Sequence, residues 1–393
     1  MLFREDSEKL KDYIIEQRRY FHRHPELSFE ETETTAAIGR QLETMDLTPH
    51  YFRDYPGVWA EIQGGCAVAG SHTVALRADI DALPVDEKTG LSFASEKQGV
   101  MHACGHDNHI AMLLGAARIL KNHQSELPGN VKILFQAAEE SCHGAEYYVN
   151  HGFLDGVDAI YSSHIWGDLD APFINLEPGV RMASCDNFTI HVTGCSAHGS
   201  APHQGADAIV AAASIITQVQ IIVSRKNDPK TPLVITIGEI QGGQRFNIIA
   251  NEVVMRGTVR THSEDARNRV EGWLRETVEA TAKANGTAAT LEYSYYPAPL
   301  VNDERLTDIA RRSAISLYGE GVLAPLEKTM GSEDFSYYLD KIPGVFAFIG
   351  TRNPGKGLLS KNHNDHFDVD ESVLTRGTAL YAQFAYDYLK AYT

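Results

Sequence analysis

The spacing of apolar residues predicts alternating helices and strands in the first part of the chain. Helical spacing predicts a helix over residues 7–26, which ends where His24-Pro25 disfavours a further helical turn, and a second helix over 28–45. Later segments predict a buried helix over 109–123, a further helix over 144–154, and strands over 57–64, 72–81, 130–140 and 157–165. Strand, helix and strand in this order imply a parallel βαβ unit, because parallel strands need a crossover connection.

The pattern changes near residue 185. From there the chain predicts a strand, a long apolar helix, two strands, an amphipathic helix and a last strand, over 187–194, 206–225, 232–243, 251–262, 263–286 and 288–297. This β-α-β-β-α-β order is that of the ferredoxin-like module. After Pro297 the pattern of the first part resumes, with helices over 303–319 and 372–392 and a strand over 344–351. We therefore predict an α/β protein: one domain, residues 1–184 and 299–393, has a mainly parallel sheet flanked by helices, and a second domain, residues 185–298, is inserted into it.

Composition narrows the class of protein. A chain of 393 residues with 43% hydrophobic and 22% charged residues suits two globular domains. The formal net charge of −17, from 52 acidic against 35 basic residues, argues against a nucleic-acid partner, which needs clustered Lys and Arg. The first residues form a charged amphipathic pattern without the apolar core of a signal peptide, and we expect no membrane-spanning segment. Five cysteines, an odd number, fit a reducing compartment, so we expect a cytoplasmic protein.

Residues able to do chemistry gather where the predicted strands end. In open parallel sheets, ligands bind at the carboxyl edge of the strands. The segment "HACGHDNH", residues 102–109, precedes the buried helix and packs three histidines, a cysteine and an aspartate into eight positions. The other candidates follow strands or lie near the end of the chain; they are Asp79, Asp81, Glu139, Glu140, His164 and His363.

The pair Glu139-Glu140 has two interpretations. Adjacent glutamates are usually part of a solvated loop. Here they follow an apolar strand, and carboxylates at the end of a buried strand need a cation or a raised pKa. One glutamate is then able to bind metal while its neighbour acts as general base, as activation of water by a metal requires.

Cys104 and His106 allow three interpretations. A structural zinc site would need further Cys pairs, which the chain lacks. A nucleophilic thiol would need a base from elsewhere, because two residues so close in a turn align poorly. Ligation of a catalytic metal fits best, since thiolate, imidazole and carboxylate suit Zn, Mn, Co or Ni. His164 alone would more often be a buried core histidine, but its place at a strand end favours a ligand.

The inserted domain contributes weaker candidates. The segment "GCSAHGSAPHQGADAI" places Cys195, His198 and His203 in a turn before a helix, and its small residues alone would explain a tight turn. Alternatively, Cys195 is a nucleophile, or His198 reaches a substrate carbonyl and stabilises the oxyanion formed in hydrolysis. Asn247 and Arg260 offer a neutral donor and a fork of donors for substrate, although an arginine on a strand is ordinarily a surface ion-pairing residue.

Several motifs together resemble a known family. They are "RRYFHRHPELSFEETET", "LRADIDALPV", "HACGHDNHIAMLLGAA", "FQAAEE", "AHGSAPHQGADAI", "NIIANEVVMRGTVR", "GSEDFSYY" and a late His-x3-Phe-Asp, in order over nearly the whole chain. They are similar to those of amidohydrolases that cleave N-acyl amino acids: hippurate hydrolases, N-acetyl-diaminopimelate deacetylases and auxin-conjugate hydrolases. This group lies within the co-catalytic-metal aminoacylase and carboxypeptidase superfamily.

The resemblance implies a role for each candidate. Cys104 would bridge two divalent metal ions (Mn, Zn, Co or Ni), and the other ligands would be His106, Glu140, His164 and His363. Glu139 would be the general base and later the acid. His198 would act from the inserted domain, a lid and dimerisation domain, either within its own chain or across a homodimer or higher oligomer. Asn247 and Arg260 would hold the substrate.

One residue differs from other branches of the superfamily, and one segment departs from the family pattern. Asp79, preceded by Ala78, stands near where other branches carry a ligand histidine, so we expect it to support the ligands rather than to be one. Asn364 and Asp365 replace a frequent Ser-Pro, and His366 offers a second imidazole beside His363. We choose His363, because its distance from Phe367 matches the family.

The predicted function is hydrolysis of the amide bond of an N-acyl amino acid to a carboxylate and a free amino acid. Alternatives are a dipeptidase or carboxypeptidase of aminoacylase type, a non-catalytic amino-acid- or peptide-binding protein on the same scaffold, and a thiol hydrolase that uses Cys104 or Cys195.

Overall fold

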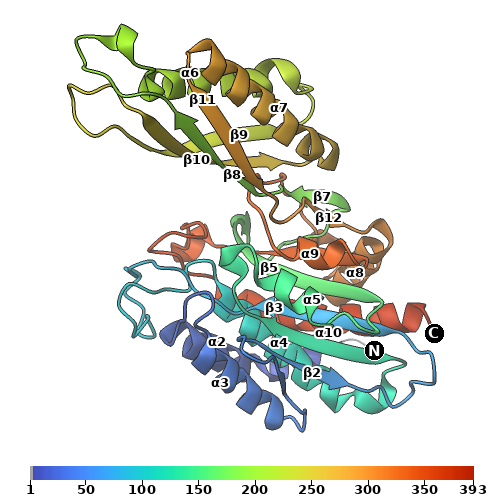
Figure 1. Ribbon diagram of the computed structural model, residues 1–393. Coiled ribbons are helices and arrows are strands. Elements are labelled where there is room, and N and C mark those ends of the chain that lie inside the picture. Colours follow the sequence, from blue (N-terminus) through green and yellow to red (C-terminus); the bar gives the residue numbers. More distant parts are fainter. Residues whose placement is uncertain (1–2) are drawn as a thin grey trace. The chain divides into compact units, whose positions relative to one another are not determined.

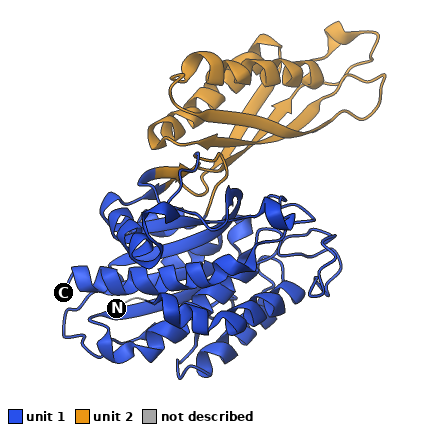
Figure 2. Cartoon of the chain, turned by 180° about the vertical axis from the view of Figure 1, so that it is seen from behind, with its two compact units in different colours: residues 1–179, 301–327, 334–393 blue, residues 180–300, 328–333 orange. Residues whose placement is uncertain are grey.

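The computed structural model describes residues 3–393, which divide into two compact units (Figure 2). Unit 1 comprises residues 1–179, 301–327 and 334–393, and unit 2 comprises 180–300 and 328–333. The domain boundaries expected from the sequence are 184/185 and 298/299. In the structure, the chain passes from unit 1 to unit 2 at 179/180 and returns at 300/301. The short segment 328–333 joins unit 2 because it contacts β10: Arg260 donates to the Met330 carbonyl at 3.2 Å.

Unit 1 is built on a seven-stranded sheet in the order β1-β2-β4-β3-β5-β13-β6 (Figure 1). The central pairs β4/β3, β3/β5 and β5/β13 are parallel, and the outer pairs are antiparallel. The strands are β1 (His50–Tyr51), β2 (Val58–Ile62), β3 (Thr73–Asp79), β4 (Asn130–Gln136), β5 (Ala159–Asp170), β6 (Ile174–Asn175) and β13 (Gly344–Arg352). The predicted mainly parallel sheet is therefore confirmed.

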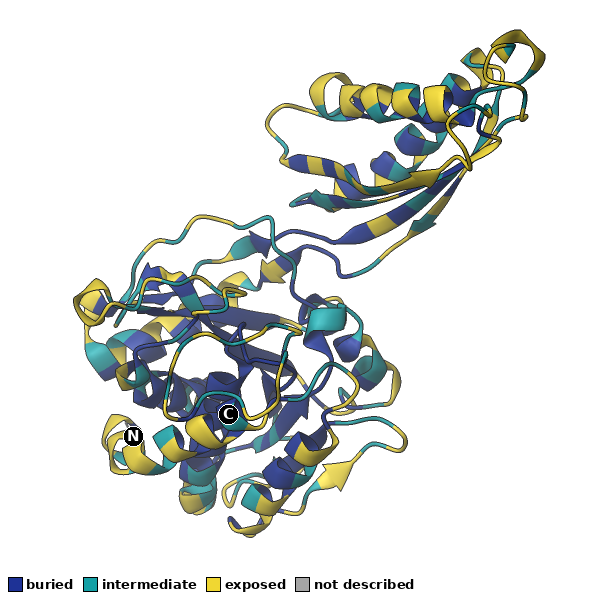
Figure 3. Cartoon of the chain, turned by 90° about the vertical axis from the view of Figure 1, so that its left-hand side faces the viewer, coloured by how far each residue is buried: buried dark blue, intermediate teal, exposed yellow. Residues whose placement is uncertain are grey.

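Helices bury this sheet. They are α1 (Arg4–Lys9), α2 (Lys11–Arg23), α3 (Thr32–Glu43), α4 (His106–Asn122), α5 (Gly144–Asn150), α8 (Glu304–Tyr318), α9 (Ser336–Leu339) and α10 (Leu374–Ala391). Helix α4 contacts β3, β5, α2 and α10. Two glycines allow α4 and α10 to approach closely: a Cβ on Gly377 would lie 2.0 Å from Met112 Sδ, and one on Gly115 would lie 2.9 Å from Thr378. Every residue of β3 is buried. Figure 3 shows the buried residues, in dark blue, gathered in the interior of unit 1.

The structure differs from the sequence prediction at two elements of unit 1. The first predicted helix is divided in two at Leu10, the residue between α1 and α2. Strand β5 continues to Asp170, so His164 lies within the strand and does not end it. Its pairing with β3 stops at Ser162, opposite Arg77, and His164 therefore lies two residues beyond the paired part of β5, level with Asp79 at the end of β3.

Unit 2 has the predicted β-α-β-β-α-β order. Its elements are β8 (Asp186–Thr193), α6 (Ala208–Ile221), β9 (Leu233–Gly242), β10 (Glu252–Thr261), α7 (Glu264–Ala284) and β11 (Ala288–Ser294). The antiparallel sheet has the order β11-β8-β10-β9, so β9 and β11 are its edges. Apolar residues of α6, α7 and the strands form a separate core. The chain passes between the units through β7 (Gly179–Met182) and β12 (Leu300–Asn302), among other crossings.

One helix of unit 2 bears on the expectation that no segment of the chain spans a membrane. Residues Ala208–Lys226 are long and apolar enough to cross a membrane, and 33% of the most apolar window is buried. The helix also packs on the sheet of unit 2 through Ala211, Ile215 and Val219. Because a core helix of a folded domain passes the same test of length and composition, this segment alone is weak evidence for a membrane span.

Candidate metal centre

The five predicted ligands come together in unit 1, at the carboxyl end of the parallel strands. Cys104 and His106 lie at the start of α4, and Gly105 between them has φ +96°, a left-handed conformation that glycine adopts readily. Glu140 follows β4 in a short 3₁₀ turn, Glu139–Ser141, and His164 lies on β5. The segment before Phe367 supplies His363. This edge is where ligands bind in open α/β sheets.

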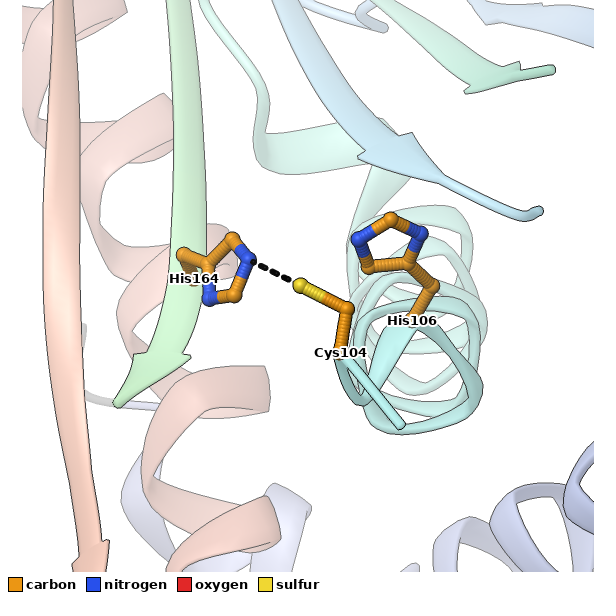
Figure 4. Close-up of side chains that lie close together, drawn as sticks. All are labelled: Cys104, His106 and His164. Atoms are coloured by element: carbon orange, nitrogen blue, oxygen red, sulfur yellow. Dashed lines mark hydrogen bonds between the residues drawn. The ribbon is translucent and has the colours of Figure 1, made fainter. Parts of the chain in front are cut away.

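Two groups of three side chains share the Cys104 sulfur. Cys104, His106 and His164 form one group, and Cys104, Glu140 and His363 form the other; within each, the potential ligand atoms lie within 4.8 Å of one another. Cys104 Sγ is 3.4 Å from His164 Nε2, with His106 beside them (Figure 4). His363 Nε2 is 3.5 Å from Glu140 Oε1. Thiolate, imidazole and carboxylate in two triads with a common sulfur are a donor set for two neighbouring cations.

The electrostatics of the cluster fit cations. Among the described residues, His106 Nε2 and Glu140 Oε1 are buried without a hydrogen-bond partner. Burial lowers the pKa of His106, but Asp79, Asp81 and Glu140 outweigh it and raise that pKa to about 10. Burial also raises the pKa of Glu140 to about 7. A divalent cation would compensate the negative charge of these buried carboxylates. It would also bind the two side-chain atoms that lack a hydrogen-bond partner.

Asp81 orients two of the ligands. His106 Nδ1–H donates to Asp81 Oδ1 at 3.1 Å, which leaves Nε2 directed at the cluster. The other oxygen of Asp81 accepts the Glu140 backbone N–H at 2.9 Å and the Ser28 hydroxyl at 2.7 Å. Asp79, the residue expected to support the ligands, contacts Arg77 and His109, and its Oδ2 lies 3.8 Å from His106 Nε2. His109 in turn accepts the Ile165 N–H at 2.9 Å, so Asp79 acts on the backbone beside His164.

His363 and His366 differ in their surroundings. His363 has φ +70°, its N–H donates to the Ala103 carbonyl at 2.7 Å, and its ring lies near Glu140. His366 is exposed, and its ring pairs with Asp365 at 2.7 Å. The geometry therefore brings His363 to the cluster.

Glu139 lies beside the ligand atoms. Its side chain is buried, the residue being 7% exposed, and Oε2 is 3.9 Å from His106 Nε2. The preceding Ala138 has φ +61°, and this turn directs Glu139 and Glu140 away from the strand axis. The buried Glu31 accepts the Ala138 N–H at 2.7 Å and so holds the turn. Burial, aided by Asp81, raises the pKa of Glu31 to about 8.

The candidates of unit 2 fall into two places. His198 forms a bridge with Ile248, and the Asn247 carbonyl accepts the Gly199 N–H at 2.9 Å, so His198 and Asn247 lie together. His198 is exposed, and its Nδ1 accepts the Ser200 N–H at 3.1 Å, which leaves Nε2 as the donor of the neutral ring. Arg260 lies near the far end of β10, eight residues after Glu252. At about 3.3 Å per residue, Arg260 lies about 26 Å along the strand from Glu252, whereas His198 and Asn247 belong to segments next to the Glu252 end of β10.

Comparison with known proteins identifies the family. Residues 75–387 match the model of peptidase family M20/M25/M40. The chain belongs to this family. It is 40% identical over 369 residues to an N-acetyl-L-cysteine deacetylase of Bacillus subtilis (94% of this chain, 86% of the relative). It is 36% identical over 385 residues to thermostable carboxypeptidase 1 of Saccharolobus solfataricus (97% and 96%). The crystal structure of the Bacillus subtilis YXEP protein, described as a dinuclear metal-binding M20 peptidase, superimposes with a TM-score of 0.85 at 35% identity (98% and 99%).

Membership of the M20 family confirms the predicted family and places the chain among hydrolases. The matched stretch contains every candidate named above, from Asp79 to His363. Two features of this M20 chain were missed by sequence reasoning. Asp81 was noted only as a residue at a strand end, and its spacing from His106 gives no sign of their hydrogen bond. The other is Arg18, which contacts Asp107, 89 residues away in the chain, and Asp368, 350 residues away.

Proposed function

We propose that the chain hydrolyses the amide bond of N-acyl amino acids and releases a carboxylate and a free amino acid. The observation that carries the proposal is the pair of triads around Cys104 Sγ, with the Glu139 carboxylate beside them. The Bacillus subtilis relative, named an N-acetyl-L-cysteine deacetylase, supports this substrate class.

The proposed ligands are Cys104, His106, Glu140, His164 and His363, and they suit two divalent ions of Mn, Zn, Co or Ni. When bound, such ions would polarise the scissile carbonyl and make water more acidic. The identity of the ions depends on cellular supply as much as on the ligands.

Glu139 moves the proton in this proposal. Its carboxylate accepts a proton from the attacking water, whose oxygen forms the new bond to the carbonyl carbon. As the carbon–nitrogen bond breaks, Glu139 donates the same proton to the leaving nitrogen. The buried position of Glu139, next to His106, keeps the carboxylate close to the reacting atoms.

The surroundings of Cys104 argue against a thiol nucleophile. Burial raises the pKa of the Cys104 thiol well above its usual value, and the carboxylates of Glu140 and Glu139 raise it further. A nucleophilic cysteine needs the opposite shift. Cys195 is exposed, and its thiol donates to the neighbouring Ser196 carbonyl at 3.8 Å.

Unit 2 would complete the site from two copies of the chain. A substrate the size of an N-acyl amino acid is too short to bridge Arg260 and the His198–Asn247 pair, because about 26 Å of β10 separates Arg260 from Glu252, at the end of the strand next to that pair. We therefore propose that one site takes Arg260 from its own chain and His198 with Asn247 from a partner. Arg260 would bind the substrate carboxylate, and His198 Nε2–H would donate to the oxyanion.

A surface of unit 2 suits such pairing. Strand β9 is an edge strand and exposes Val234 and Ile240, and helix α6 exposes further apolar side chains, Ile209, Val210 and Ile221. An edge strand flanked by apolar residues is able to pair with a second copy of itself. We propose a homodimer formed through unit 2, and a cytoplasmic location consistent with five unpaired cysteines.

Removal of metal tests the proposed function. The purified protein is expected to hydrolyse N-acetyl or N-benzoyl amino acids, to lose this activity with a chelator, and to regain it with Mn²⁺, Co²⁺, Zn²⁺ or Ni²⁺. Activity that survives chelation but not alkylation of thiols would favour the thiol hydrolase. The carboxypeptidase relative suggests cleavage of peptides as an alternative. A parallel screen of dipeptides tests it: hydrolysis of dipeptides in preference to N-acyl amino acids would favour a dipeptidase or carboxypeptidase.

A further inference from the structure

Arg18 on α2 is fully buried and binds three carboxylates. The residue is 1% exposed. Its Nε donates to Asp107 at 3.1 Å, one terminal nitrogen donates to Glu371 at 2.9 Å, and the other donates to Asp368 at 2.6 Å. A guanidinium has donors in a rigid fork, so a single Arg18 side chain fixes the relative positions of all three partners.

Two of these partners belong to segments that carry proposed metal ligands. Asp107 directly follows His106 at the start of α4. Asp368 lies five residues after His363. Arg18 therefore links the segment of Cys104 and His106 to the segment of His363, although Asp107 and Asp368 lie far apart in the chain.

The segment 362–368 is attached to the start of α4 at both ends. At its beginning, the Asn362 amide donates to the Cys104 carbonyl at 2.8 Å, and the His363 N–H donates to the Ala103 carbonyl at 2.7 Å. At its end, Asp368 reaches Asp107 through Arg18. The His363 ring projects between these two attachments, and its side chain is 56% exposed. Packing alone therefore holds this ring less firmly than the buried ring of His164.

Other side chains hold Arg18 itself in place. Its guanidinium lies 4.9 Å from the centre of the Phe93 ring. Asp107 also accepts from His22 Nδ1 at 2.9 Å, so α2 contacts this carboxylate through two residues. Arg19, the next residue, also lies 4.9 Å from the Phe93 ring and donates to Glu371 at 2.6 Å, but its side chain is 46% exposed. Arg19 thus shares the surroundings of Arg18 without the contacts to Asp107 and Asp368.

Stability alone does not account for a charge cluster at this position. Replacement of a buried ion pair by well-packed apolar residues is often neutral or stabilising, because desolvation of the charges offsets their attraction. A buried guanidinium with several hydrogen-bond donors is better suited to holding its partners at fixed distances. Arg18 holds in this way the two segments that carry proposed ligands, through Asp107 and Asp368.

We propose that Arg18 is a positioning residue that sets the place of His363 relative to Cys104 and His106, and so controls binding of the cation held by His363. The inference rests on the proposed ligand set and deepens it. Arg18 touches neither substrate nor ligand atoms; it acts through Asp107 and Asp368.

Titration of the metal-free protein with Co²⁺ tests this role. Absorption bands of Co²⁺ report a thiolate and the geometry of each site, and calorimetry gives the two affinities. In Arg18→Gln, affinity for one of the two ions is expected to fall by about 10- to 100-fold, the usual effect of a residue behind a ligand, while the other affinity stays unchanged. The control Arg19→Gln, which removes contacts to Glu371 and Phe93 only, is expected to bind both ions as the unmodified chain does. Arg18→Lys is expected to recover part of the loss.

The outcomes separate the inference from the function on which it rests. If folded Arg18→Gln binds both ions with unchanged affinity, or loses both equally, the positioning role is wrong while the proposed function stands. If the unmodified chain does not bind two Co²⁺ ions, both proposals fail. Should Arg18→Gln not fold, Asp368→Asn decides, because it leaves the Arg18 contacts to Asp107 and Glu371; a selective loss of one ion supports the inference, and unchanged binding of both overturns it.

Discussion

The candidate residues of the two units are held in different ways. In unit 1, the proposed ligands lie around one sulfur, and each is fixed by further contacts, such as the bond from His106 to Asp81 and the bond from the His363 backbone to Ala103. In unit 2, His198 is exposed, and Arg260 lies at the other end of the same sheet. Unit 1 therefore holds the proposed ligands together in advance, whereas the roles proposed for the groups of unit 2 require that these groups be brought to the site. The difference separates residues that make the chemistry possible from residues that accelerate it.

Loss of Glu139 would have the largest effect of a single substitution that leaves the metal site intact. Glu139→Gln is expected to lower kcat by about 10²- to 10⁴-fold, because a positioned acid–base group contributes this much. Metal content, measured by elemental analysis, is expected to stay at two ions, since the proposed ligand is Glu140. Loss of bound metal together with activity would mean that the roles of the two glutamates are exchanged.

Loss of His198 tests whether unit 2 acts on the chemistry. His198→Ala is expected to lower kcat by about 10²- to 10³-fold, the usual effect of removing one oxyanion donor, with unchanged metal content. If His198 acts in a partner's site, mixing this variant with Glu139→Gln, unfolded and refolded together, is expected to restore activity that neither has alone. An absence of complementation in verified mixed dimers would contradict the shared site.

Loss of Arg260 has the smallest expected effect. Arg260→Ala is expected to raise KM by about 10-fold or more for substrates with a free carboxylate, since a hydrogen bond to a charged group contributes about 1.5–3 kcal/mol. The same variant is expected to treat the corresponding amide substrate as the unmodified chain does. Equal effects on both substrates would indicate that the contacts of Arg260 to Met330 and Ser332 are structural.

Much of unit 1 could be predicted from the sequence because its signals are local. Apolar strands that end in polar residues located the edge of the sheet, and His363 could be chosen by its distance from Phe367. The contact of Asp81 with His106 could not be predicted in this way. Asp79 ends the buried strand β3 and Asp81 follows it closely, and only the folded chain shows that His106 lies near both carboxylates, with its Nδ1 bonded to Asp81.

The parts that were missed depend on contacts between distant segments. Nothing local to "RRYFHRHPE" shows that Arg18 meets Asp368, since the pairing exists only once α2, α4 and the end of the chain are folded together. The segment 328–333 likewise follows a unit 1 helix in the sequence and joins unit 2 through Arg260 and His262. The role of unit 2 as a lid and dimerisation domain stays a prediction.

The position of β13 has a consequence for the order of assembly during synthesis. This strand lies between β5 and β6 in the sheet of unit 1, yet it follows the whole of residues 180–300 in the chain. Unit 2 has its own core, nearly all of it from that one continuous stretch, so it is able to fold while the ribosome is still adding the end of the chain. In the sheet of unit 1, β5 lacks its β13 neighbour until the ribosome has added β13 and α10. His363, which also comes late, is the last proposed ligand to arrive, and a nascent chain cannot hold its full set of metal ions before translation is nearly complete.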